Sequence, residues 1–203
     1  KKNFYINDLF PKIFFVENID QLSINGFLKH INLNESALVV TSKSGETIET
    51  LAQFFFIKEQ IKNQNSNTEI FIITENKKST LKRIQEEESY FFIEHNKRIG
   101  GRFSVFSVVG LLPAVIAGLK IEEFVKGADF FLESIIEDES KFDDYFFGSF
   151  SQVLLIDKGF NISVLMPYID CFDDFSKWYR QLWAESIGKD HKGTTPINAL
   201  GTV

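Results

Sequence analysis

The segment over residues 41–50 reads TSKSGETIET and combines five hydroxyl side chains with one lysine. It follows the apolar run at residues 37–40, which is typical of a strand covered on both faces. A helical pattern starts near Glu46, so the unpaired N–H groups and positive dipole end of that helix would point back at the segment. Such a helix start stabilises an anion. The segment therefore predicts a phosphate site built from Ser42, Lys43, Ser44, Thr47 and Thr50.

Helix capping is the alternative explanation for these hydroxyls. Ser and Thr are common N-caps, and either Ser44 or Thr47 could serve that purpose alone. Four hydroxyls with a lysine among them exceed what one helix end requires, which favours phosphate binding. The segment lacks the G-x-x-x-x-G-K pattern, so it is not a nucleoside-triphosphate loop.

A second candidate is Gly100-Gly101-Arg102, which follows the last strand predicted for the first half of the chain. Paired glycines let backbone approach a ligand, and a guanidinium offers a planar fork of donors for a phosphate or an oxyanion. A glycine turn followed by an arginine paired with a surface carboxylate would look the same. Both interpretations remain open on these residues alone.

A third candidate pairs Gln181 with Glu185, which lie four residues apart and so share one face of a predicted helix, about 5.4 Å apart along its axis. The residues between them are apolar, so the helix is expected to be buried on much of its surface and Glu185 to be partly desolvated. A partly buried carboxylate is suited to general-base chemistry. The alternative is a solvated Glu185 paired with Lys189 at i+4.

The histidines and the cysteine offer little further chemistry. His30, His95 and His191 are scattered without metal-ligand spacing, which argues against a zinc site. Cys171 has no histidine or basic pair beside it in the sequence and is expected to be a packed thiol. We therefore expect neither a zinc site nor a cysteine nucleophile.

Strand and helix patterns alternate along the chain, which predicts an α/β fold with a parallel sheet sandwiched by helices. Ligands bind such sheets beyond the carboxyl ends of the strands, where the hydroxyl segment lies. The expected domains are residues 1–125, a first α/β domain, and residues 126–203, a helical connection with the start of a second α/β domain. Strands are predicted at residues 12–16, 37–40, 70–73, 90–93 and 161–166, and helices at residues 20–30, 46–63, 79–88, 107–119, 121–137, 142–158 and 173–187.

The formal net charge of −6 over 203 residues argues against nucleic acid or an anionic membrane surface as the main partner. An anionic substrate must then be held by local cations. A single cysteine and the lack of a signal-peptide pattern fit a cytoplasmic setting.

Three segments together closely resemble the phosphoglucose isomerase family: residues 42–50, residues 100–104 (GGRFS) and residues 181–189 (QLWAESIGK). Residues 110–114 and 192–203 extend the similarity over essentially the whole chain. The resemblance implies a pair of sugar-isomerase (SIS) domains, each a parallel sheet between helices. Residues 1–125 would be the first of these domains without its first strand, and residues 126–203 would include an incomplete second one. It also implies interconversion of glucose 6-phosphate and fructose 6-phosphate without a cofactor.

By this resemblance, Ser42, Lys43, Ser44 and Thr47 would hold the phosphate of a hexose 6-phosphate. Glu185 would move the proton between C2 and C1, Arg102 would stabilise the cis-enediolate, and Gln181 and Gly101 would line the sugar site. We expect these groups to converge on one cleft. The resemblance also implies a homodimer, a glycine- and serine-rich loop before Lys1 and a ring-opening histidine after Val203. A noncatalytic sugar-phosphate sensor, which needs the phosphate segment but not Glu185 and Gln181, is the competing hypothesis.

Overall fold

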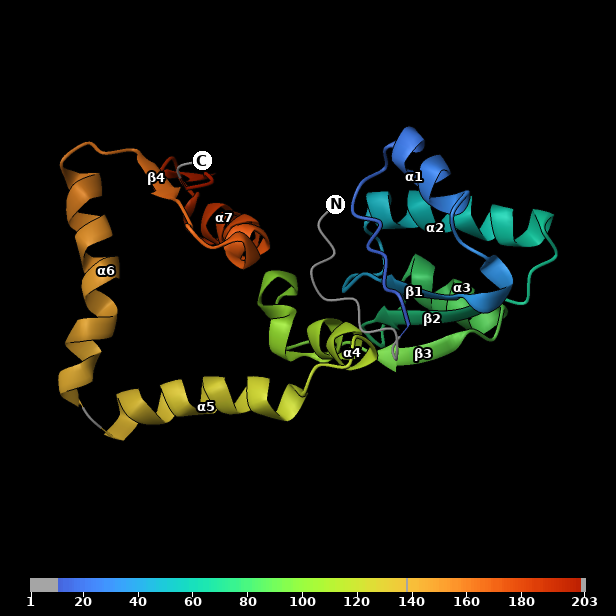
Figure 1. Cartoon of the computed structure of the whole chain (residues 1–203), viewed down its shortest axis with the longest axis horizontal. Helices are drawn as coiled ribbons and strands as arrows, with labels where there is room; N and C mark the ends of the chain where they lie inside the picture. Colours follow the sequence, from blue (N-terminus) through green and yellow to red (C-terminus); the bar gives the residue numbers. More distant parts are fainter. Residues whose placement is uncertain (1–10, 138, 202–203) are drawn as a thin grey trace. The chain divides into compact units, whose positions relative to one another are not determined.

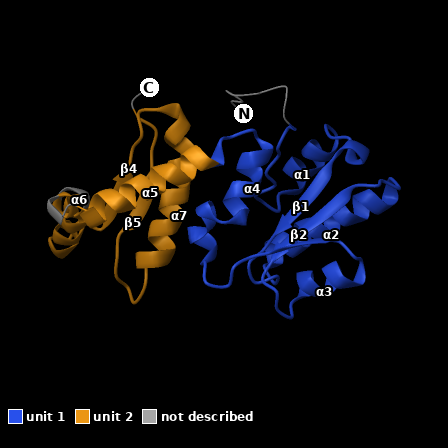
Figure 2. Cartoon of the chain, turned by 90° about the horizontal axis from the view of Figure 1, so that it is seen from below, with its two compact units in different colours: residues 1–121 blue, residues 122–203 orange. Residues whose placement is uncertain are grey.

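The computed structural model describes residues 11–137 and 139–201. By its internal contacts the chain divides into two compact units, one up to Ile121 and one from Glu122 onward (Figure 2). The domain boundary predicted after residue 125 stays a prediction, because contact density alone does not define a domain.

The first unit contains a three-stranded parallel sheet in the order β1-β2-β3 (Figure 1). Its register places Val39 beside Phe71 and Phe71 beside Phe91. The predicted α/β class with parallel strands is confirmed. In chain order the elements are α1 (Gln21–Leu28), η1 (Leu33–Glu35), β1 (Ala37–Thr41), α2 (Ile48–Asn63), β2 (Glu69–Thr74), α3 (Thr80–Glu87), β3 (Phe91–Glu94), η2 (Gly101–Phe106) and α4 (Val108–Ile116).

The core lies between the sheet and helices α2 and α3. Ile70 and Ile72 alternate along β2 and point to one face, where they meet Phe54 of α2 and Leu81 of α3. Two right-handed crossovers in the order β1-β2-β3 place both helices on this same face. The opposite face carries a row in which Val39 is 40% and Phe91 is 55% exposed.

Residues 12–16 form no strand, although their apolar and β-branched sequence predicted one. Strand propensity takes effect only where a neighbouring strand supplies hydrogen bonds. Here Phe14 instead packs its ring against Phe27, 5.4 Å away between centroids, near the end of α1. Asp20 caps α1, since its carboxylate accepts a hydrogen bond from the Ser23 N–H at 2.8 Å.

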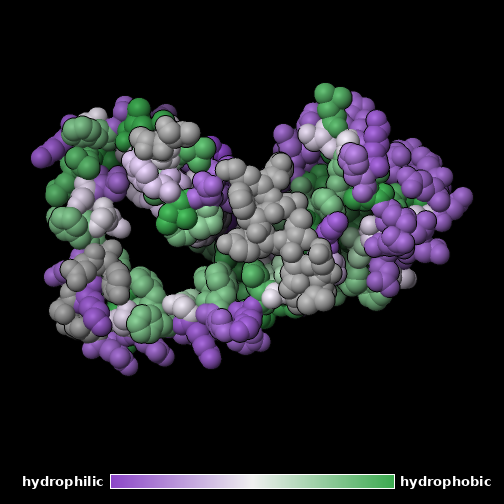
Figure 3. Space-filling view, viewed as in Figure 1, coloured by the Kyte–Doolittle hydropathy of each residue, from purple (hydrophilic) through white to green (hydrophobic). Residues whose placement is uncertain are grey.

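The second unit has long helices and a small parallel sheet made of β4 and β5. Its elements are α5 (Ile121–Glu137), α6 (Glu139–Asp157), β4 (Ile162–Leu165), η3 (Asp170–Phe172), α7 (Asp173–Ile187) and β5 (Thr195–Asn198). Hydrophobic residues shown in green lie at the surface of this unit in Figure 3, and Phe130, Ile136 and Phe147 are among the exposed ones. Among the described residues, every buried hydrophobic side chain belongs to the first unit.

Strand β5 was not predicted from the sequence. It contains Pro196, and a proline within an apolar run argues against a strand unless the strand lies at a sheet edge. A two-stranded sheet consists only of edges, so the proline is tolerated there. β5 pairs in parallel with β4 and gives α7 a surface to pack against.

Candidate active site

Three hydroxyls gather in the loop between β1 and α2, which we call the hydroxyl loop (residues 42–47). The Ser42 Oγ lies 2.8 Å from the Thr47 Oγ1 and 3.5 Å from the Ser44 Oγ. Backbone N–H groups of the same loop donate to them, from Gly45 to Ser42 at 3.2 Å and from Glu46 to Ser44 at 3.1 Å. Ser42 is only 5% exposed. The loop is therefore folded around its own hydroxyls.

Helix α2 begins directly after these hydroxyls, so its first residues show whether a hydroxyl of the loop caps the helix. Thr47 occupies the N-cap position, but its side chain makes no capping hydrogen bond to the helix. The hydroxyl of Thr47 is instead bonded to Ser42. The positive end of α2 is thus not occupied by its own N-cap side chain, and it faces the hydroxyl loop.

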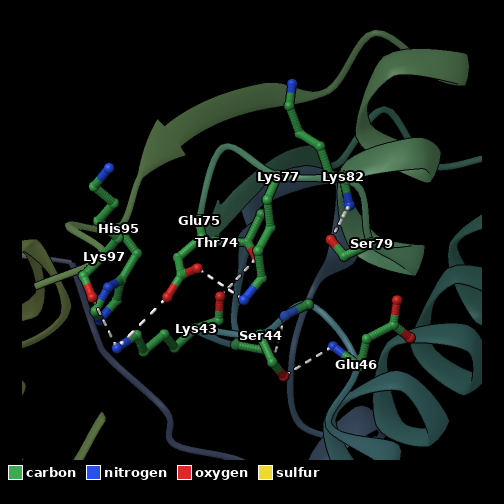
Figure 4. Close-up of polar contacts among 12 residues, drawn as sticks. Lys43, Ser44, Glu46, Thr74, Glu75, Lys77, Ser79, Lys82, His95 and Lys97 are labelled. Atoms are coloured by element: carbon green, nitrogen blue, oxygen red, sulfur yellow. Dashed lines mark hydrogen bonds and ion pairs between the residues drawn. The ribbon is translucent and has the colours of Figure 1, made fainter. Parts of the chain in front are cut away.

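The simplest expectation is that the Lys43 ammonium lies among the hydroxyls, but it points to other partners (Figure 4). Its Nζ donates to the Lys97 carbonyl at 3.2 Å and is 3.5 Å from the carboxylate of Glu75. The Lys43 carbonyl accepts from the Thr74 hydroxyl at 3.3 Å and from the Glu75 N–H at 3.1 Å. Lys43 is therefore tied to the loop after β2 at its backbone and at its side chain.

Glu75 and the basic residues near it are site features that sequence analysis missed. Contact with Lys77, and to a smaller extent the charge of Lys43, lowers the pKa of the Glu75 carboxyl below its ordinary value of 4.5. Lys77 follows β2, while Lys97 and Arg98 follow β3. The Lys77 ammonium lies 2.8 Å from the Glu75 carboxylate. Since the carboxyl ends of parallel strands share one edge of a sheet, all three basic residues stand in loops at the edge where the hydroxyl loop lies. Their positions in consecutive strand-end loops were the signal that could have found them.

Gly101 and Arg102 begin the short helix η2, which follows the loop after β3. The Ser104 hydroxyl donates to the Gly101 carbonyl and holds this turn closed. The Arg102 guanidinium lies 5.1 Å from the centre of the Phe103 ring. An added Cβ at Gly101 would meet no atom within 4 Å, so the backbone there is open to close approach. Arg102 thus follows β3 along the chain, as the hydroxyl loop follows β1.

Gln181 and Glu185 share a face of α7, as predicted. The Gln181 Nε2 donates to the Glu185 Oε1 at 3.0 Å. The prediction that Glu185 is partly buried is wrong within this unit, because the residue is exposed. The apolar residues between the two turn to other faces of the helix: the Trp183 Nε1 donates to the Thr194 Oγ1 at 2.9 Å, which ties α7 to the segment entering β5.

The structure brings the predicted residues together in two groups. Ser42, Ser44 and Thr47 form one group through their hydroxyls, and Lys43 lies in the same loop. Gln181 and Glu185 form the other group. The first group and Arg102 lie in the first unit, and the second group lies in the second unit. Convergence of the two groups on one cleft stays a prediction.

Gly45 is the residue of the hydroxyl loop that tolerates no side chain. Its φ of +70° is in the left-handed region, and an added Cβ would collide with the Ser79 hydroxyl. We therefore expect Gly45→Ala to lower the free energy of unfolding by about 1–3 kcal/mol, measured by urea denaturation of the intact protein.

The matched control is Gly26→Ala, in α1, where an added Cβ would meet nothing within 4 Å. Alanine is the better helix former, so this variant should be more stable by up to about 1 kcal/mol. Equal stability changes in the two variants would show that Gly45 is not under steric constraint.

Neither a metal site nor a membrane span is found within residues 11–137 and 139–201. No group of three or more His, Cys, Asp or Glu side chains in these ranges could hold a metal ion. Among the same residues, no helix is long and apolar enough to cross a membrane.

Comparison with known proteins places these residues in a family context. A family model described as phosphoglucose isomerase matches residues 3–200. A probable glucose-6-phosphate isomerase of Methanococcus maripaludis is 35% identical, over 94% of this chain and 44% of its own length. A glucose-6-phosphate isomerase of Rubrobacter xylanophilus is 36% identical, over 95% of this chain and 45% of its own length. The chain therefore spans about half the length of the curated relatives it matches.

Solved structures agree with the fold. A hypothetical protein from Thermus thermophilus superposes with a TM-score of 0.78 at 27% identity, covering 90% of this chain and 45% of that one. A glucose-6-phosphate isomerase from Chlamydia trachomatis gives a TM-score of 0.66 at 24% identity, covering 91% of this chain and 38% of its own. The second likeness supports the fold alone.

Proposed function

Because this chain belongs to the phosphoglucose isomerase family, we propose that its protein is an aldose–ketose isomerase that interconverts glucose 6-phosphate and fructose 6-phosphate. The reaction serves glycolysis and gluconeogenesis. The observation that carries the proposal is the joint presence of the family match over residues 3–200 and a hydroxyl cluster at the start of an uncapped helix. We further propose a cytoplasmic homodimer that needs no metal or organic cofactor.

The hydroxyl loop binds the substrate phosphate in this proposal. Ser42, Ser44 and Thr47 supply hydroxyl donors that are already close to one another, so little side-chain entropy is lost on binding. The start of α2 adds backbone N–H donors and a favourable dipole. Lys43 is a residue of this loop, and a dianionic phosphate competes with Glu75 for its ammonium.

The chemical step is a proton transfer between neighbouring carbons. The Glu185 carboxylate removes the proton from C2 of the open-chain aldose, and the electron pair of that C–H bond becomes the C1–C2 double bond of a cis-enediolate. Its negative charge rests on the former carbonyl oxygen, where the Arg102 guanidinium stabilises it. Glu185 then returns the proton to C1 and the C2 carbonyl forms, with a second proton passing between the two substrate oxygens.

Positioning completes the mechanism. The amide of Gln181 donates to one Glu185 oxygen at 3.0 Å, which fixes the orientation of the carboxylate. Gly101 lets the backbone before Arg102 come close to the sugar.

A coupled assay on the intact protein tests the proposal. Fructose 6-phosphate is supplied, and glucose 6-phosphate is detected through its dehydrogenase. Turnover at a kcat of about 1–10³ s⁻¹ is the expected result. Binding of fructose 6-phosphate without any turnover would contradict the proposal and favour a noncatalytic sensor.

A further inference from the structure

The side chain of Glu46 leaves the hydroxyl loop and binds the first residue of another helix. Its Oε1 accepts a hydrogen bond from the Thr80 N–H at 2.6 Å, and its Oε2 accepts one from the Thr80 hydroxyl at 2.8 Å. Thr80 is the first residue of α3. Figure 4 shows the Glu46 carboxylate directed away from Ser44, while the backbone N–H of Glu46 donates to the Ser44 hydroxyl. A single residue thus links α3 to a hydroxyl of the loop.

The neighbouring residues reinforce this link. The Leu81 N–H donates to the Gly45 carbonyl at 3.1 Å, and the Lys82 N–H donates to the Ser79 hydroxyl at 3.3 Å. Gly45 also packs against Ser79 without room for a side chain. The first three N–H groups of α3 are therefore satisfied by Glu46, Gly45 and Ser79. Glu46 and Gly45 of the hydroxyl loop accept hydrogen bonds from N–H groups at the start of α3. The Thr47 side chain, by contrast, makes no capping hydrogen bond at the start of α2.

We propose that Glu46 is a positioning residue of the anion site, which holds the hydroxyl loop on α3 so that its three hydroxyls keep their places at the start of α2. This inference rests on the proposed function. Glu46 does not touch the substrate and is not a catalytic residue. Its charge is compensated by the two Thr80 donors and the dipole of α3, so it does not oppose a phosphate in the loop.

Two variants separate positioning from charge. Glu46→Gln removes the charge and weakens the contact with Thr80, whereas Thr80→Val removes one donor and leaves the charge of Glu46 intact. The matched control is Glu88→Gln at the other end of α3, where Glu88 pairs with Lys58 of α2 at 2.6 Å. This control makes the same chemical change and also breaks a charged contact between the α2 and α3 regions.

The first readout is the affinity of the intact protein for inorganic phosphate, measured by calorimetry. We expect Glu46→Gln to weaken it about tenfold and Thr80→Val several-fold, because a hydrogen bond to a charged group contributes at about that scale. Glu88→Gln should stay within about twofold of wild type. In the coupled assay, Glu46→Gln should raise KM more than it lowers kcat, since the loss is one of uniform binding. The double variant should bind phosphate about as well as Glu46→Gln alone.

The second readout does not depend on the proposed function. Hydrogen exchange at the Leu81 amide reports directly on the bond between Gly45 and α3. It should be at least about tenfold faster in Glu46→Gln than in Glu88→Gln. Equal exchange, or an equal change of phosphate affinity in the two variants, would overturn the inference. If the wild-type protein bound no phosphate, the proposed function would fail, and the Leu81 exchange would still decide the role of Glu46.

Discussion

Glu185→Gln in the intact protein is expected to lower kcat by about 10²–10⁴-fold, the usual contribution of a general acid–base group. The amide cannot accept a proton at C2, although it fits the same space and keeps a hydrogen bond with Gln181. The affinity for inorganic phosphate should change by less than about twofold, because in the proposed mechanism Glu185 acts at C1 and C2 of the sugar, whereas the hydroxyl loop binds the phosphate. The coupled assay and calorimetry give the two values.

The matched control for this variant is Asp174→Asn, on the same helix α7. The Asp174 side chain is 93% exposed and contacts Lys177 in the first turn, far along the helix from Glu185. It should keep wild-type turnover. Solvent-deuterium exchange at C1 and C2 of the substrate makes the assignment specific, since normal exchange in Glu185→Gln would show that another group moves the proton.

Arg102→Gln is expected to lower kcat/KM by about 10²–10³-fold, comparable to the removal of one oxyanion donor in other enzymes. The guanidinium acts on charge that develops in the cis-enediolate, so most of the loss should fall on kcat rather than on KM. Arg102→Lys should recover part of the activity, because an ammonium keeps the charge but not the planar fork.

Arg83→Gln on α3 is the control for Arg102→Gln. Its side chain is 68% exposed and lies 4.0 Å from Glu87 in an i,i+4 pair, a contact of small energetic value. Wild-type kinetics are expected. If the loss in Arg102→Gln appeared only in KM, the guanidinium would contribute to ground-state binding of the phosphate and not to stabilisation of the enediolate.

Local sequence was sufficient for elements that carry their own signals. The apolar run over residues 37–40 became β1, and the charged and apolar periodicity over residues 173–187 became α7 with the predicted bounds. Helical spacing placed Gln181 and Glu185 on one face, which the hydrogen bond between them confirms. These features depend on backbone geometry over a few residues, and that geometry is encoded locally.

Tertiary structure decided the features that depend on distant partners. Within the part of the chain that the structure describes, residues 12–16 have strand propensity but pair with no strand, whereas β5 contains a proline and still pairs with β4. The ammonium of Lys43 contacts Glu75 and Lys97, and the carboxylate of Glu46 contacts Thr80, across separations of 32 to 54 positions.

Sequence by itself therefore determined the family, the α/β class and the identity of the residues proposed to act. Only the folded chain decided which groups hold the hydroxyl loop in place, namely Glu75 at Lys43 and α3 at Glu46. The physical reason is that these contacts arise when the carboxyl ends of parallel strands meet at one edge of the sheet, and no local pattern encodes which side chains then face one another.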